Sequence, residues 1–287
     1  LEDTVTISGR KLWNSVPLTA DSADLPTVTF EIYQYLEGSE PSDLHENLNE
    51  GTKVASMTIK SEEWENLKTD DNQYEFTFKE MNENGKTGPF PLYNEDGQRY
   101  VYVLHEKTED ALESNTDWNL VYKDPVYNEY QITNTYDPQL GALSVKKLLS
   151  VPKNRQPYAA IQFALYRQAP NANDDGYGEP VLVEKQVWTS EEIWAAVQKI
   201  NLPPLGTDNV EVDKTFTFKN LPIYAPNGEK YRYFVAEILD DGSGYEMNYE
   251  AAVKVGSYST VDEVFQNGKT ETTEIVTEED GTEIITI

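Results

Sequence analysis

The sequence predicts an all-β protein made of two similar antiparallel β-sandwiches in tandem, each with one short helix in a loop insertion. Three observations indicate this fold. Most of the chain consists of short alternating or β-branched segments, tight-turn dipeptides separate these segments, and one order of motifs occurs twice. A length of 287 residues is also enough for two domains that each bury a core.

The first predicted strands alternate apolar and polar residues, or are rich in β-branched and aromatic ones, as strands with one buried face do. They cover residues 5–7, 28–32, 74–78 and 100–104. Turns are predicted at the tight-turn dipeptides, which are Asn84-Gly85, Asp96-Gly97, Asn227-Gly228 and Asp280-Gly281. Short strands joined by such turns are typical of antiparallel sheets.

Two segments are predicted to be helical, near residues 61–67 and 190–200. We expect Ser61 to be the N-cap of the first helix. Thr189 and Glu192 have the spacing of a capping box, in which each side chain bonds to the backbone N–H of the other residue. The second helix should therefore begin directly after Thr189.

The two helices belong to an internal repeat. Residues 76–79 and 216–219 both read Phe-Thr-Phe-Lys, and Pro91-Leu92-Tyr93 corresponds to Pro222-Ile223-Tyr224. At the offset of 131 residues that relates Pro91 to Pro222, a further set corresponds in order: Gly97, Tyr100, Tyr102 and Glu106 with Gly228, Tyr231, Tyr233 and Glu237. The sequence therefore predicts a duplicated domain, with bounds at 1–137 and 138–287 and a short Pro/Gly hinge between the two copies.

Composition excludes several classes of function. The 51 acidic residues outnumber the 23 basic ones, and a net charge of −28 makes nucleic acids and anionic membranes poor partners. The absence of cysteine excludes disulfides, thiolate zinc sites and a thiol nucleophile. With no long apolar run and no leader peptide in the sequence, we expect either a cytosolic protein or a fragment without its targeting ends.

The matched motifs also resemble a known family. Gly9-Arg10-Lys11-Leu12-Trp13, then residues 100–106, then Ile132-Thr133-Asn134-Thr135-Tyr136 follow the order seen in CnaB-type domains. These Ig-like β-sandwiches occur as the B repeats of collagen adhesins and as domains of sortase-assembled pilins of Gram-positive bacteria. The resemblance covers nearly all of the first repeat, and in the second repeat it includes residues 143–147 and 231–237.

The resemblance implies an intramolecular isopeptide bond in the first domain. In the family a lysine on the first strand joins an asparagine on the last strand, assisted by a glutamate on a central strand. These roles correspond to Lys11, Asn134 and Glu106. The reaction is a single self-modification that needs no cofactor, so we expect no enzymatic turnover of an external substrate.

In the second domain the resemblance identifies Lys147 and Glu237, with Lys146 as the neighbouring candidate. Lys147 is preferred because Leu143 and Val145 share its face at a period of two. No asparagine lies on the last predicted strand, which we expect to be truncated. Asn248 and Asn267 are the substitutes, but both are predicted to lie in loops, so we expect Lys147 and Glu237 to have no covalent partner in this sequence.

The function that the resemblance implies is structural. We expect a stalk or pilin segment of an extracellular, cell-wall-anchored adhesin, monomeric as a fragment. Its partners would be the neighbouring domains of the parent surface protein, with a host or matrix ligand as a further candidate. The alternative is a carbohydrate- or protein-binding module that uses exposed aromatic residues, for which the candidates are Tyr122, Tyr127 and Tyr130.

An enzyme or a metalloprotein is not predicted. The only histidines are His45, in a polar loop, and His105, next to Glu106 and therefore on the opposite face of its strand. Residues 171–176 resemble the start of a calcium loop, but Leu182 stands where such a loop needs a glutamate. We therefore expect no bound metal.

Overall fold

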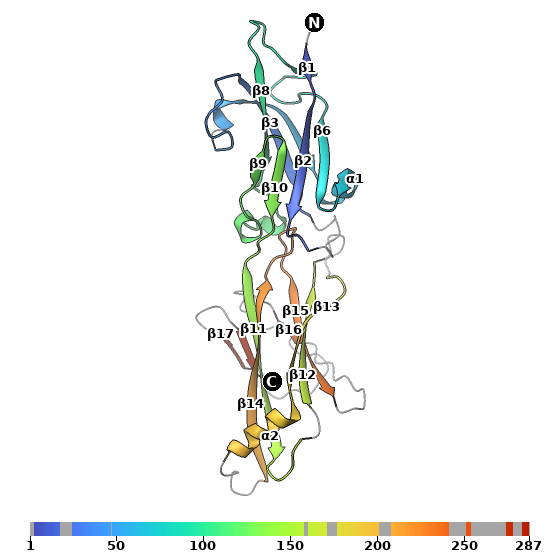
Figure 1. Cartoon of the computed structure of the whole chain (residues 1–287), viewed down its shortest axis with the longest axis vertical. Coiled ribbons are helices and arrows are strands. Elements are labelled where there is room, and N and C mark those ends of the chain that lie inside the picture. Colours follow the sequence, from blue (N-terminus) through green and yellow to red (C-terminus); the bar gives the residue numbers. More distant parts are fainter. Residues whose placement is uncertain are drawn as a thin grey trace. The chain divides into compact units, whose positions relative to one another are not determined.

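The computed structural model describes residues 3–17, 25–46, 48–157, 160–170, 177–200, 208–240, 251–253, 274–277 and 283–286. The chain divides into two compact units. Unit 1 comprises Leu1–Pro138 and Tyr224–Glu229, and unit 2 comprises Gln139–Ile223 and Lys230–Ile287. The bounds 1–137 and 138–287 remain our proposal for the two homologous domains. The described residues form an all-β fold with two short α-helices (Figure 1).

Unit 1 contains two main sheets. The first has five strands in the order β5-β6-β2-β10-β9, with bounds Lys68–Asp70, Gln73–Phe78, Ile7–Asn14, Gln131–Thr135 and Val126–Asn128. The second has three strands in the order β4-β3-β8, with bounds Thr52–Ile59, Val28–Leu36 and Tyr100–Lys107. A small ribbon pairs β1 (Thr4–Val5) with β7 (Phe90–Pro91). The short helical turns are η2 (Leu48–Glu50), η3 (Ser61–Glu63), α1 (Trp64–Leu67), η4 (Glu113–Asn115) and η5 (Trp118–Leu120).

The two sheets of unit 1 pack face to face. Phe30 of β3 stacks on Phe76 of β6, with the ring centroids 4.3 Å apart, and so joins one sheet to the other. Trp13 and Trp64, which are both fully buried, extend this core and meet edge to face at 5.8 Å. Because each strand turns alternate side chains inward, the core is a layer between the sheets, as in a β-sandwich.

Unit 2 repeats this plan. One sheet has the order β14-β11-β18-β17, with bounds Asn209–Pro222, Leu140–Pro152, Glu283–Thr286 and Glu274–Thr277. The other has the order β13-β12-β15-β16, with bounds Val181–Trp188, Ala160–Gln168, Arg232–Asp240 and Ala251–Val253. Phe163 and Phe216 meet between the sheets at 4.7 Å. They are the counterparts of Phe30 and Phe76, so the duplicated motifs build equivalent core contacts.

Another pair of equivalent contacts supports the repeat. The Tyr102 hydroxyl donates to the Pro91 carbonyl at 2.6 Å, and the Tyr233 hydroxyl, 131 residues later, donates to the Pro222 carbonyl at 2.7 Å. Most strand pairs are antiparallel, as predicted. The exceptions are β2 with β10 and β11 with β18, which are parallel. In each unit the first long strand and the last strand therefore lie side by side and run in the same direction.

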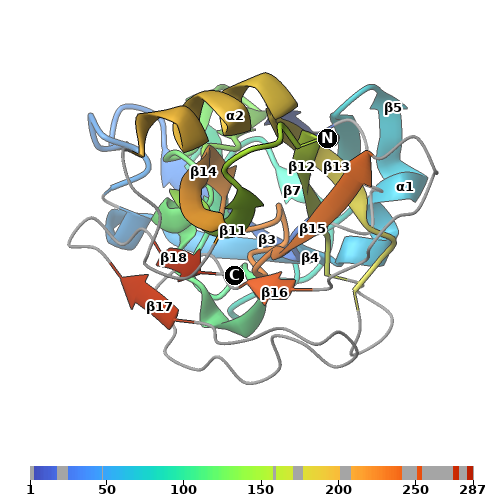
Figure 2. The same ribbon diagram turned by 90° about the horizontal axis from the view of Figure 1, so that it is seen from below.

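The two predicted helices begin differently. The capping box of α2 (Ser190–Lys199) is confirmed, since the Thr189 hydroxyl accepts from the N–H of Glu192 and the Glu192 carboxylate accepts from the N–H of Thr189. Figure 2 shows α2 beside β14. The prediction that Ser61 is an N-cap is wrong. The cap is Lys60, whose N–H donates to the Glu63 carboxylate at 2.8 Å, and Ser61 is the first residue of η3.

Candidate functional site

Lys11 lies on the inner face of β2, where alternate residues from Ile7 onward are buried. It has 0% exposure although its side chain carries an amine. Gly9, two residues earlier on the same face, makes room for the core around it. A Cβ atom at Gly9 would lie 2.4 Å from the Phe76 ring and 2.9 Å from Leu104, so only glycine fits there without a shift.

Glu106 reaches this amine from the opposite sheet. It lies on β8, is 1% exposed, and accepts a hydrogen bond from Lys11 Nζ to its Oε2 atom at 2.7 Å. Its neighbour Leu104 occupies the same inner face and is buried as well. A carboxylate and an amine removed from water in this way are costly unless they are paired.

Asn134 completes the group from the last strand of the unit. It lies on β10, which runs beside β2 (Figure 1). It pairs in register with Trp13 of this parallel strand and has 0% exposure. Its Nδ2 donates to Glu106 Oε1 at 2.5 Å, so Glu106 contacts Lys11 with one oxygen and Asn134 with the other. Asn134 Oδ1 is buried and has no hydrogen-bond partner in the part of the chain that the structure describes.

The environment shifts the Lys11 amine toward its neutral form. Burial lowers the pKa of Lys11 from 10.5 to about 8, although the charge of Glu106 and its hydrogen bond oppose the shift. The amine also lies 4.3 Å from the centroid of the Trp13 ring. Roughly a tenth of a group with this pKa is neutral at pH 7, compared with well under a thousandth of an ordinary lysine.

The second unit contains the corresponding pair. Lys147 of β11 donates to Glu237 of β15 at 2.9 Å, with side-chain exposures of 16% and 2%. Lys146 points elsewhere and pairs with Asp213 at 3.3 Å on a more exposed surface. Lys147 is thus the lysine that meets the glutamate.

No asparagine joins the Lys147–Glu237 pair among the described residues. In unit 1 the asparagine lies opposite the residue two positions after the lysine, which is Trp13. In unit 2 the described residues of β18 pair with β11 up to Lys146 opposite Thr286, and none of the four residues Glu283–Thr286 is an asparagine. The predicted substitutes, Asn248 and Asn267, lie outside the described residues.

The aromatic residues of the binding-module alternative do not form one exposed platform. Tyr122 is only 2% exposed and stacks on Trp118 at 4.6 Å inside the core. Tyr130 is 38% exposed, while its hydroxyl donates to the Tyr102 carbonyl at 3.1 Å. Tyr127 stacks on His45 with the centroids 3.4 Å apart. The expectation that Tyr122 is exposed is wrong, because alternation along a strand does not reveal what covers each face.

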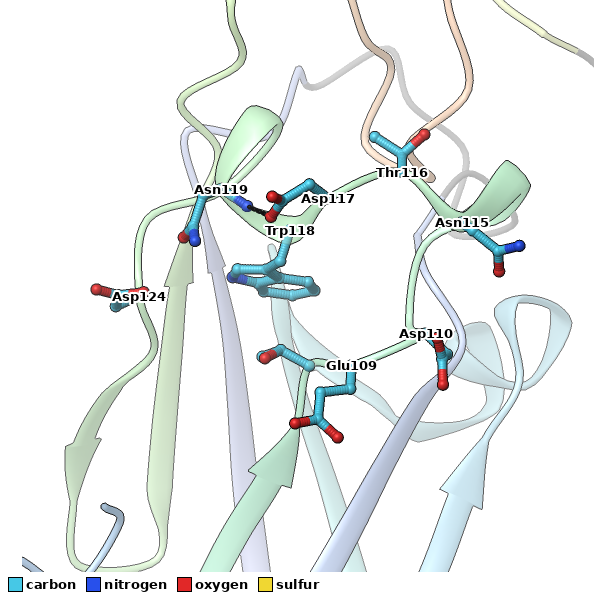
Figure 3. Close-up of a pocket in the computed structure, with 9 residues that line it drawn as sticks. Glu109, Asp110, Asn115, Thr116, Asp117, Trp118, Asn119 and Asp124 are labelled. Atoms are coloured by element: carbon cyan, nitrogen blue, oxygen red, sulfur yellow. Dashed lines mark hydrogen bonds between the residues drawn. The ribbon is translucent and has the colours of Figure 1, made fainter.

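Sequence reasoning did not identify a pocket of about 400 Å³ between β8 and η5 (Figure 3). Its wall includes the Trp118 ring and four acidic side chains, those of Glu109, Asp110, Asp117 and Asp124. Asp117 is used to cap η5, where it accepts from the N–H of Asn119 at 3.1 Å. Acidic residues are so common in this chain that their presence around a pocket gave no signal.

The described residues contain neither a metal-binding cluster of acidic and histidine side chains nor a membrane-spanning helix. No group of three or more histidine, aspartate or glutamate side chains is placed to hold a metal ion. The calcium-like loop at 171–176 lies outside the described residues. No described helix is long and apolar enough to span a bilayer.

Comparisons with known proteins found similar solved structures only. No family model matches the chain, and no curated protein does. A single B repeat unit of the collagen-binding surface protein of Staphylococcus aureus is 17% identical, with coverage of 99% of this chain and 97% of that one and a TM-score of 0.25. The major pilin T-13 of Streptococcus pyogenes is 12% identical, with coverage of 100% and 96% and a TM-score of 0.27.

The shaft pilin SpaA of Lactobacillus rhamnosus GG is a third match, 12% identical over 82% of this chain and 87% of that one, with a TM-score of 0.26. The chain is thus similar to B-repeat and pilin domains, the types that its motifs resemble. TM-scores this low add no support to the fold, which is evident from the two pairs of packed sheets.

Proposed function

We propose that unit 1 forms an intramolecular isopeptide bond between Lys11 and Asn134, and that the chain is a structural stalk or pilin segment of a bacterial surface adhesin. The observation that carries the proposal is the buried group in which Glu106 contacts both the amine and the amide. Lys11 and Asn134 come from the first long strand and the last strand of the unit, so a bond between them would tie the two ends together.

In the proposed reaction the neutral Lys11 amine attacks Cγ of Asn134. The Nζ–Cγ bond forms, the Cγ–Nδ2 bond breaks, and the proton lost by Nζ travels through Glu106 to Nδ2, which leaves as ammonia. If the Asn134 side-chain amide rotates by 180° about its Cβ–Cγ bond, its Oδ1 atom faces Glu106. A protonated Glu106 would then donate a hydrogen bond to Oδ1, which would satisfy this unpaired oxygen and polarise the carbonyl. Holding the buried amine and amide against the same carboxyl group supplies the high effective concentration that amide exchange requires.

The mechanical consequence follows from connectivity. Force applied at the ends of unit 1 would act on the covalent bridge between β2 and β10 and would leave the intervening strands unloaded. Closing a loop of more than a hundred residues also restrains the unfolded chain, by about 4–5 kcal/mol if the entropy model for disulfides applies. Since an amide bond resists thiols, the proposal suits a chain without cysteine outside the cell.

We therefore place the protein on the cell surface, with the neighbouring domains of its parent protein as partners and a host or matrix molecule as a candidate ligand. Unit 2 contributes a Lys147–Glu237 pair that has no amide partner among the described residues, and we assign it no bond in this sequence. The chemistry occurs once per molecule and gives no turnover of an external substrate.

Peptide mapping tests the bond. After digestion of the denatured protein, tandem mass spectrometry should find one branched peptide that joins Lys11 to Asn134. Glu106→Ala should abolish it because no group remains to transfer protons, whereas Glu237→Ala, the equivalent change in unit 2, should retain it. Separate linear peptides for Lys11 and Asn134 in the wild-type protein would contradict the proposal.

A further inference from the structure

Unit 1 contains two copies of the same turn. One copy, residues 93–98, joins β7 to β8, and the other, residues 224–229, lies 131 positions later in the chain. In both copies the second residue donates its N–H to the sixth and the fifth donates to the second, at 2.7–3.1 Å. The fifth residue is in both cases a glycine with positive φ, 78° for Gly97 and 90° for Gly228. The duplicated sequence therefore folds into the same local structure twice.

The second copy is seated in a socket, which we define as residues 112–122 together with Tyr136. Four main-chain carbonyls of the turn accept hydrogen bonds there. The pairs are the Tyr136 hydroxyl with Tyr224 at 2.5 Å, the Tyr122 hydroxyl with Pro226 at 2.7 Å, the Glu113 N–H with Asn227 at 2.9 Å and the Thr116 hydroxyl with Gly228 at 2.9 Å. All of residues 224–228 are buried.

The first copy presents the same acceptors without a partner. The carbonyls that correspond to the four bound ones belong to Tyr93, Glu95, Asp96 and Gly97, and none of them accepts a hydrogen bond within the described part of the chain. Tyr93 is 45% exposed, whereas its counterpart Tyr224 is 9% exposed. A turn that already has the docked geometry while it is exposed is preorganised to enter a socket of this kind.

The socket recognises the main chain of the turn more than its side chains. Each of the four hydrogen bonds is made to a carbonyl oxygen, which every residue supplies. The strict requirement is at Gly228, where a Cβ atom would lie 2.6 Å from Leu112. Because Gly97 occupies this position in the first copy, the turn 93–98 meets the same steric requirement.

Charge is the respect in which the two copies differ. Glu95 and Asp96 stand where the docked copy is uncharged. In the docked copy, burial followed by the charge of Glu113 raises the pKa of Glu229, so this socket already disfavours negative charge on the turn. A socket that accepts the turn 93–98 should therefore carry a neutral or basic residue in place of Glu113.

We propose that the turn 93–98 is a docking surface for another β-sandwich domain of the parent protein. The socket of that domain offers the same hydroxyl and N–H donors, with a neutral or basic residue where the present socket has Glu113. The inference rests on the proposed stalk role, because it names the surface through which unit 1 meets a neighbouring domain.

Chimeras of the full chain test the fit. In the first, residues 224–229 are replaced by the 93–98 sequence carrying Glu95→Gln and Asp96→Asn. The Glu113 N–H should keep its protection from hydrogen exchange, because its acceptor is a main-chain carbonyl. A control chimera with residues 83–88, which also contain an Asn-Gly turn but place Thr87 at the glycine position, should lose protection by about tenfold or more.

A further chimera tests the charge preference of the socket. It carries the 93–98 sequence with both acids, and repulsion from Glu113 should lower the protection of the same N–H group. Glu113→Gln in this chimera should restore the protection, because it removes the charge and leaves the main-chain donor in place.

A titration followed by NMR tests docking itself. The unlabelled probe is the full chain with Gly228→Val, which vacates the socket, and Glu113→Lys, which makes it basic. Added to labelled wild-type chain, the probe should shift the amide signals of residues 95–97 and leave those of the exposed Asn84-Gly85 turn unchanged. Gly97→Val in the labelled chain should abolish these shifts.

Two results would overturn the inference. One is an amide-bearing chimera that loses as much Glu113 protection as the control chimera, since the turn would then not fit the socket. The other is unchanged signals of residues 95–97 in the presence of the probe. All the changes lie outside the Lys11–Glu106–Asn134 group, so either result would leave the peptide map, and with it the proposed isopeptide bond, unaffected.

Discussion

Burial changes the reactivity of the group formed by Lys11, Glu106 and Asn134. Alone, a buried amine or carboxylate is destabilising, and here each is within hydrogen-bond distance of the next. The Lys147–Glu237 pair has similar geometry, but Lys147 keeps 16% of its side-chain surface exposed, whereas Lys11 keeps none. The two pairs therefore differ in desolvation as well as in the presence of an amide.

The lowered pKa of Lys11 predicts how stability depends on pH when the bond cannot form. In an Asn134→Ala variant, between about pH 8 and pH 10 the unfolded lysine still holds its proton and the folded one has lost it. The unfolded state then binds more protons, so the free energy of unfolding should rise with pH across this window, by about 2–3 kcal/mol.

Urea unfolding at about pH 7.5, 8.5 and 9.5 measures this change in the free energy of unfolding. The matched control is Lys11→Met combined with Asn134→Ala, which has no amine to titrate and should lose the rise. If both variants show the same pH dependence, the account of Lys11 is wrong.

At the scale of elements, alternation and turn chemistry explain most of what could be predicted. The inward position of Lys11 follows from the period of two in β2, and α2 begins where its capping box predicts. The errors have a common cause. The local pattern predicts that Ser61 caps its helix and that Tyr122 is exposed. Instead, the Glu63 carboxylate accepts a hydrogen bond from the N–H of Lys60, and the Tyr122 ring stacks on Trp118. Contacts between distant segments are not contained in a local pattern.

The two helix starts give a paired prediction. Thr189→Ala should lower the free energy of unfolding by about 1 kcal/mol, because the N–H of Glu192 loses the hydroxyl that caps it. Ser61→Ala should change it by less than about 0.5 kcal/mol, since Ser61 does not cap its helix. Chemical denaturation of both variants checks this. Equal losses would show that the caps have been misassigned.

At the scale of the whole molecule, the duplicated motifs were enough to predict two tandem β-sandwiches. The parallel pairing of first and last strands was not predicted, although it brings Asn134 beside β2. The meeting of His45 with His105 was also missed, since 60 residues separate them and nothing in a polar loop shows where it folds back. A single sequence shows which face of a strand is buried, but it does not show which distant segment packs against that face.

Single-molecule pulling on the full chain tests the mechanical role. With the bond present, the segment between Lys11 and Asn134 should stay locked. Lys11→Met should release an additional contour length of about 400–440 Å, the extended length of that segment. Lys147→Met should release none beyond the wild-type value. Identical extension of all three proteins would contradict a covalent bond that carries the applied force in unit 1.

The most direct test of the central claim is the intact mass of the denatured wild-type protein. The Lys11–Asn134 bond requires a mass lower than that of the sequence by one ammonia, and Lys11→Met should show no such deficit from its own expected mass. A deficit of two ammonias would mean that unit 2 also forms a bond. A wild-type mass equal to that of the sequence would contradict the isopeptide bond while leaving the β-sandwich fold unaffected.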